Sequence, residues 1–153
     1  MTSEVSDVRV GPSGFGGWFM LVVIGQTMAP VATILNAALS MTAYSRMMAT
    51  SDGAIAFFGE AAFSAAFLYI QISCTLAMYR RSKNFPTLFL LQWFAMIVMG
   101  IGDILLFSIE ANRSPWALGE QIELRKILSP IVTTGLWVWY VFASVRVRNT
   151  FTR

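Results

Sequence analysis

The sequence predicts an all-α membrane protein, an antiparallel bundle of four transmembrane helices with both termini in the cytoplasm. Of its 153 residues, 56% are hydrophobic and 12% are charged, whereas roughly 25% of the residues of a soluble domain are charged. Four stretches are also long and apolar enough to cross the hydrocarbon core of a bilayer, which takes about 20 residues. We therefore expect residues 1–153 to form a single four-span domain.

The positions of the charged residues delimit the spans. No charged residue stands between Arg9 and Arg46, and Pro30 in that interval predicts a kink. The second span is interrupted by Glu60 and the third by Asp103, while the fourth carries no charge. Each span must be an α-helix, because a lone strand would leave backbone groups unpaired in hydrocarbon. The expected spans are residues 17–43, 54–79, 85–109 and 127–145.

Lys and Arg residues are distributed unequally between the two sides of the predicted bundle. The N-terminus, the second connection and the C-terminus together carry seven of them, and the first and third connections carry four. Because basic connections stay on the cytoplasmic side, both termini are predicted to be cytoplasmic. The basic residues expected at that membrane surface are Arg80, Arg81, Lys83, Arg146 and Arg148.

The composition also excludes several classes of function. The chain contains no histidine, which removes the commonest general base and the commonest transition-metal ligand. Its single cysteine, Cys74, cannot form an intramolecular disulfide. The net charge of +3 is scattered between apolar runs and does not predict nucleic-acid binding. We expect no enzymatic activity, no catalytic residue, no metal and no cofactor; the expected partners are the lipid bilayer and another membrane protein or a second copy of the chain.

The ionisable residues inside the spans are the strongest candidates for a functional site. Glu60 and Gln71 fall on one face of the second span, and Gln92 and Asp103 on one face of the third. A short basic turn joins these two spans, so they should pack as a hairpin. Glu60 lies as far from the middle of this turn as Asp103, and Gln71 as far as Gln92. The sequence therefore predicts an acid pair at one depth and an amide pair at another.

Two carboxyl groups at one depth in a low dielectric cannot both stay ionised, so they either share a proton or are joined by cations. Arg46, Arg125 and Lys126 stand near the outer ends of the spans and are the candidate cation partners. Two interpretations stay open: an acid–base cluster that closes the bundle, and a proton or cation relay. Gln71 and Gln92 are expected to hydrogen-bond as a clasp between the helices.

The first span carries a stripe of small and weakly polar residues. Such a stripe lets another helix backbone approach closely, so we expect it to be a packing face. The stripe consists of Ala29, Ala32, Thr33, Asn36 and Ser40.

Several short sequence elements resemble a known family. They are Gly16-Gly17-Trp18 at the first span, Glu60, the basic turn running into Asn84-Phe85-Pro86-Thr87-Leu88-Phe89, Asp103, and above all the ending from Trp137 to Phe151. These elements are similar to the bacterial family labelled domain of unknown function 2569, over about residues 14–151. The resemblance implies a small four-span protein of the bacterial inner membrane, and it implies no particular activity.

For function, we expect a non-catalytic accessory or assembly subunit, or a regulatory one, of a bacterial inner-membrane complex, which binds another membrane protein through its helix faces. A small transporter, channel or proton-coupled module that uses Glu60 and Asp103 is the alternative. An immunity-type membrane protein is a third possibility.

Overall fold

Every regular element of the described chain is a helix. The computed structural model describes residues 11–45, 51–110 and 124–152. Its helices are α1 (Phe19–Ser45), α2 (Ser51–Tyr79), α3 (Phe85–Glu110), α5 (Leu124–Ala143) and α6 (Val145–Thr150). Three of them, α1, α2 and α3, contain segments long and apolar enough to cross a membrane, and α5 contains a shorter apolar segment, Leu128–Ala143. The prediction of an all-helical membrane protein is confirmed; four spans were expected, and the described part contains three to four apolar helices able to cross a membrane.

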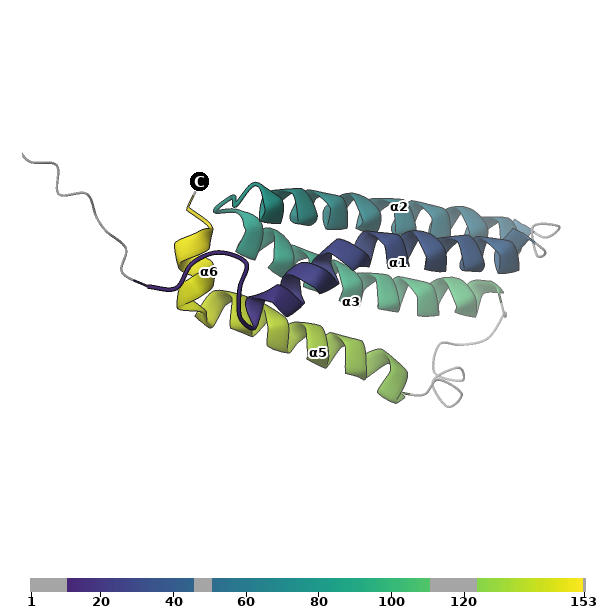
Figure 1. Cartoon of the computed structure of the whole chain (residues 1–153). Coiled ribbons are helices and arrows are strands. Elements are labelled where there is room, and N and C mark those ends of the chain that lie inside the picture. The colour runs from purple at the N-terminus through teal and green to yellow at the C-terminus, as the bar shows by residue number, and fades with distance from the viewer. Residues whose placement is uncertain (1–10, 46–50, 111–123, 153) are drawn as a thin grey trace, which may run out of the picture.

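The long helices lie side by side, and α5 is the most loosely attached (Figure 1). Helix α2 packs against both α1 and α3, whereas α5 packs against α3. Among the described helices, α1 and α5 do not form a packed pair. The ring of four long helices is therefore open between α1 and α5.

A tight turn joins α2 to α3 and sets their register. Arg81 adopts the left-handed backbone conformation, with a φ of 53°. The N–H of Ser82 donates to the carbonyl of Ala77 at 2.9 Å, and the N–H of Arg81 donates to that of Met78 at 3.1 Å. These bonds satisfy carbonyl groups that the end of α2 would otherwise leave free. The turn thus ends α2 without unpaired backbone groups.

Pro30 lies inside α1, which changes direction near its middle (Figure 1). Proline has no N–H, so the carbonyl of Gln26, four residues earlier, loses its helical donor. The hydroxyl of Thr75 on α2 donates to this carbonyl at 3.2 Å. The predicted kink therefore exposes a backbone acceptor that a neighbouring helix uses.

Trp93 attaches α5 to α3. Its indole N–H donates to the carbonyl of Ile131 at 2.9 Å, and its ring lies 3.4 Å from the position that a Cβ would take at Gly135. The indole therefore packs directly on the α5 backbone at Gly135.

Helix α6 and residues 11–18 close the end of the bundle that carries the α2–α3 turn (Figure 1). Phe151 stacks on Phe85 with ring centroids 4.5 Å apart and meets Phe19 edge-on at 5.6 Å. Phe15 joins them through Phe151 at 6.5 Å. We call these four rings, Phe15, Phe19, Phe85 and Phe151, the end cluster.

The last predicted span, 127–145, extends beyond the end of α5. Helix α5 stops at Ala143, and Val145 already belongs to α6. Ser144 between them is extended, with φ −75° and ψ 120°, so the chain turns there and α6 buries Val147 against the bundle. The sequence is apolar across the break, which is why the charge pattern did not reveal it.

Candidate functional site

Glu60 and Asp103 each stand next to a glycine at which α2 and α3 pack closely. A Cβ at Gly102 would lie 2.7 Å from the Phe63 ring, and one at Gly59 would lie 2.9 Å from Leu106. Only glycine fits at such distances, so these two positions allow the helix backbones to come together. The neighbouring residues Glu60 and Asp103 are thereby brought face to face.

The structure places these two carboxyl groups within interaction range of each other. Glu60 is buried, and the hydroxyl of Ser64 donates to its Oε1 at 3.3 Å. Asp103 is half-buried, and its Oδ1 is buried without a hydrogen-bond partner in the described part of the chain. Two carboxyl groups in such contact can share one proton, which would then bridge the helices.

A cavity of about 270 Å³ lies beside Asp103, between α2, α3 and α5. Its volume exceeds the roughly 30 Å³ that one water molecule occupies in the liquid, so it has room for several. Besides Asp103, the lining residues are Phe67, Met96, Met99, Gly100, Pro130 and Ile131. Asp103 thus borders a cavity of this size, whereas Glu60 does not line it.

The predicted cation partners of this pair cannot be placed. Arg46 lies outside the described residues. Arg125 and Lys126 belong to the first turn of α5, but their side chains also lie outside the described part.

The amide clasp forms between different residues from those predicted. Gln92 pairs reciprocally with Gln26 of α1, its Oε1 accepting at 2.8 Å and its Nε2 donating at 3.1 Å. Gln71 contributes its backbone carbonyl, which accepts from Gln26 at 3.3 Å, while its side-chain Oε1 is buried without a partner among the described residues. The predicted clasp between Gln71 and Gln92 is therefore corrected: α1 crosses close enough to α3 for Gln26 to displace Gln71.

The positions at which α1 and α3 begin in the structure account for the pairing of Gln26 with Gln92. Gln26 lies seven residues after Phe19, where α1 begins, and Gln92 lies seven residues after Phe85, where α3 begins. Phe19 and Phe85 are in ring contact at 6.1 Å, so the two amides stand at one depth. Counting from the helix starts rather than from the turn reveals the pair.

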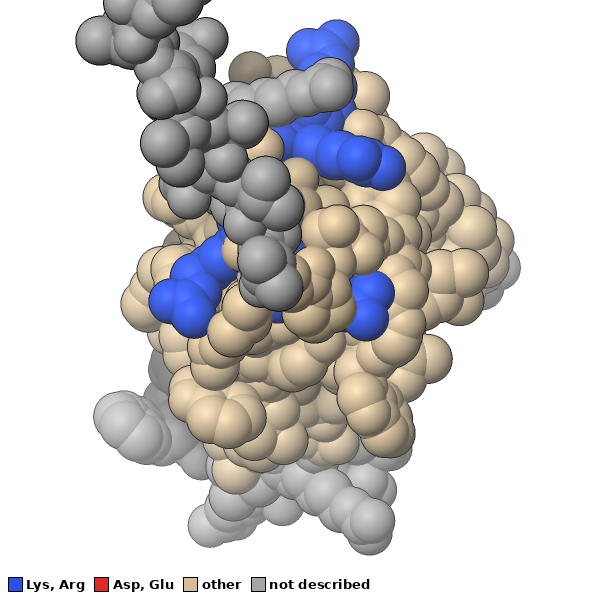
Figure 2. All heavy atoms as spheres, turned by 60° about the vertical axis from the view of Figure 1, so that its left-hand side comes forward, with Lys and Arg blue, Asp and Glu red and all other residues tan. Residues whose placement is uncertain are grey.

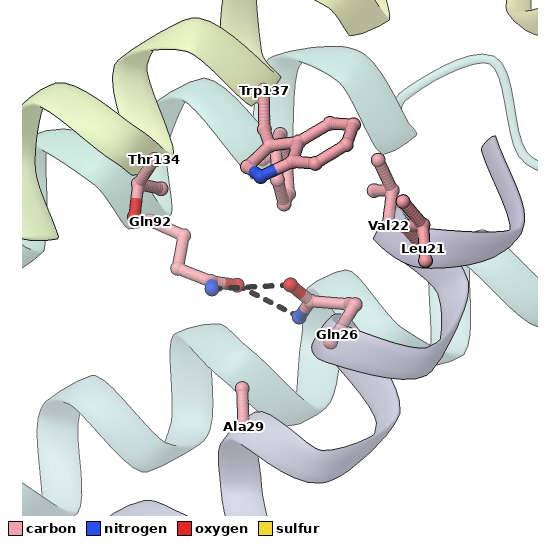
Figure 3. A pocket seen from close by; sticks show the side chains of 9 residues that line it. Leu21, Val22, Gln26, Ala29, Gln92, Thr134 and Trp137 are labelled. Carbon is pink, nitrogen blue, oxygen red and sulfur yellow. Dashed lines mark hydrogen bonds between the residues drawn. The ribbon is translucent and has the colours of Figure 1, made fainter. Parts of the chain in front are cut away.

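The clasp forms the floor of a groove between α1, α3 and α5 (Figure 3). This groove encloses a cavity of about 230 Å³, to which α1 contributes Gly25 and Ala29, and α5 contributes Thr134 and Trp137. A Cβ at Gly25 would meet nothing within 4 Å. On the α1 side, the groove is lined by Gly25 and Ala29 together with the larger Leu21, Val22 and Gln26.

The small-residue stripe of α1 is only partly covered. Ala29 lines the groove, and Thr33 and Ser40 are half-buried, whereas Ala32 and Asn36 are exposed. Ala32 and Asn36 are thus the members of the stripe that are not covered by another described helix of this chain.

The basic residues expected at the membrane surface gather at the end of the bundle that carries α6 (Figure 2). Arg80, Arg81, Lys83 and Arg148 are exposed, and Arg146 is half-buried. Among the described residues, Figure 2 shows no acidic side chain on this face.

These features define a helical membrane protein with a polar interior. The chain belongs to a family of proteins of unknown function, DUF2569, whose family model matches residues 12–152. The resemblance drawn from the sequence elements is thereby confirmed. No curated protein and no solved structure matches the chain.

Proposed function

We propose that this protein is a non-catalytic accessory or assembly subunit of a bacterial inner-membrane complex. In this proposal, the long helices form an antiparallel four-helix bundle with both termini in the cytoplasm. The face of α1 that exposes Ala32 and Asn36 binds another membrane protein. The concentration of exposed Lys and Arg side chains at the α6 end supports this orientation, because such residues favour the cytoplasmic side.

The observation that carries the proposal is Asn36. It lies within the apolar span Phe19–Thr42, it is exposed, and no hydrogen bond joins it to another described residue. An unpaired amide in hydrocarbon is unfavourable, and Asn side chains in membranes hydrogen-bond across helix interfaces. The neighbouring Ala32 is small and exposed, so a partner helix could approach closely enough to bond with Asn36.

Photocrosslinking in intact membranes tests this proposal. A photoreactive amino acid placed at Ala32 should yield an adduct of discrete mass, because this position lies on the face that carries Asn36. The matched control is Ala38, which is also small and exposed on α1 but points about 120° away round the helix.

The adduct should disappear when Ala32 labelling is combined with Asn36→Leu. An adduct at twice the mass of the chain would identify the partner as a second copy. Equal crosslinking at Ala32 and Ala38, or crosslinking that survives Asn36→Leu, would refute binding through this face.

The acid pair supports the alternative, a small proton- or cation-coupled module. The supporting observation is that Asp103 lines a cavity while its buried Oδ1 lacks a partner among the described residues. Intramembrane carboxyl groups of this kind are found in proton and ion pathways.

Proteoliposome flux measurements across a pH gradient distinguish this alternative. If it holds, the wild-type protein carries protons or cations, and Glu60→Gln lowers the flux without lowering the amount of folded protein. Flux that is absent, or identical in the wild type and the variant, would eliminate it.

A further inference from the structure

A second hollow lies between the start of α1 and the end of α5, on the surface of the bundle. It has a volume of about 440 Å³, within the range of small-molecule sites. It is lined by Trp18, Thr133, Leu136, Trp137, Trp139 and Tyr140. Trp137 also lines the cavity beside the amide clasp, so the two cavities are neighbours.

The hollow runs from the membrane surface inwards. Tyr140 lies near the α6 end of α5, and Thr133 lies seven residues earlier, which is about 10 Å deeper along the helix. Trp18 is exposed beside it, and aromatic side chains of this kind are enriched at the membrane–water interface. An occupant must therefore be apolar at depth and polar at the surface.

A positive charge stands next to Trp18, near the surface end of the hollow. The Arg146 guanidinium lies against Gly16 and Gly17, with its Cζ 3.8 Å from the position of a Cβ at Gly17, and Gly17 directly precedes Trp18. Nη1 donates to the carbonyl of Ser13 at 3.3 Å, and this is the one hydrogen bond that the Arg146 guanidinium makes with the described residues. Its other N–H groups are free to bind an anion.

We propose that this hollow binds one anionic phospholipid of the surrounding bilayer. An acyl chain would lie along Trp18, Trp137 and Thr133, and the phosphate would pair with Arg146. The geometry favours a lipid over a peptide because the hollow is apolar along the membrane depth and cationic where the headgroup layer begins. This site is at the opposite end of α1 from Asn36, so it does not depend on the partner proposed above.

Native mass spectrometry tests the proposal directly. Full-length protein is reconstituted into vesicles of equal parts phosphatidylglycerol and phosphatidylethanolamine, extracted in mild detergent, and examined for retained lipid. We expect one phosphatidylglycerol per chain, retained in preference to phosphatidylethanolamine. Arg146→Gln should reduce this preference about fivefold, since one basic side chain near a membrane contributes roughly that factor.

The matched control for charge is Arg148→Gln, because Arg148 is an exposed basic residue of the same helix. It should leave retention unchanged. Since Arg146 also holds the carbonyl of Ser13, Arg146→Lys serves as a second variant, which keeps the charge and should keep the preference.

The apolar part of the site is tested independently of Arg146. Thr133→Phe should fill the hollow and lower lipid retention, whereas Val132→Phe, at an exposed neighbour outside the lining, should not. Equal retention of the two lipids by the wild type would overturn the proposal. So would an Arg146→Gln variant that behaves like Arg148→Gln, or a Thr133→Phe variant that behaves like Val132→Phe.

Discussion

At the scale of single residues, the amide clasp contains fewer donor hydrogens than acceptor oxygens. The Gln26 amide nitrogen has two hydrogens and faces three acceptors: Gln92 Oε1 at 2.8 Å, Thr75 Oγ1 at 3.2 Å and the Gln71 carbonyl at 3.3 Å. The Thr75 hydroxyl has one hydrogen and two acceptor carbonyls, of Gln26 and Gln71. The acceptors therefore outnumber the donor hydrogens. Through these contacts, Gln26 connects α1 to both α2 and α3.

Replacing Gln26 by Leu should destabilise the protein by about 1–3 kcal/mol, because the buried Gln92 amide loses its partner. Gln92→Leu should cost a similar amount. The double variant should cost less than the two single variants together, since it leaves no unpaired amide. Unfolding in mixed detergent micelles measures these free energies, and strictly additive costs would show that the two side chains do not interact.

At the scale of the helices, the contact between α2 and α3 depends on glycine at two positions. Gly59 faces Leu106, and Gly102 faces Phe63, each closer than a Cβ could lie. Both glycines are next to an acidic residue, so the same contact that packs the helices also brings Glu60 and Asp103 together. The acid pair is in this sense a product of helix packing.

Gly102→Ala should lower the free energy of unfolding by about 1–3 kcal/mol, because the added methyl group must displace the Phe63 ring. Gly100→Ala is the matched control on the same helix, since a Cβ there meets nothing within 4 Å. The control should be neutral or mildly stabilising, because alanine favours helix over glycine. Equal effects of the two substitutions in the same unfolding measurement would contradict this packing.

At the scale of the whole molecule, the two ends of the described chain are locked together. The hydroxyl of Thr150 on α6 accepts from the N–H of Gly14 at 2.8 Å. Phe151 connects Phe15 to the starts of α1 and α3 through the end cluster. Residues about 136 positions apart in the sequence therefore close one end of the bundle as a unit.

Phe151→Ala should remove the centre of this unit and destabilise the protein by roughly 3 kcal/mol, as expected for a buried phenylalanine. It should also speed amide hydrogen exchange in residues 11–18, measured by mass spectrometry in nanodiscs. Val145→Ala, at an exposed position of α6, the helix that Phe151 directly follows, should leave that exchange unchanged. Unaltered protection of residues 11–18 in Phe151→Ala would mean that this segment is held by other contacts.

The sequence alone determined the membrane class, the family, and the approximate spans, because a hydrocarbon core demands long uncharged helices whose limits are marked by charges. The sequence also predicted that Glu60 and Asp103 lie at the same depth, because a short turn sets the register of a hairpin. The partner of Gln92 depended instead on the path of α1 across α3, which no local periodicity encodes. Likewise, the break at Ser144 and the burial of Val147 arise from packing against the end cluster, so only the tertiary structure revealed them.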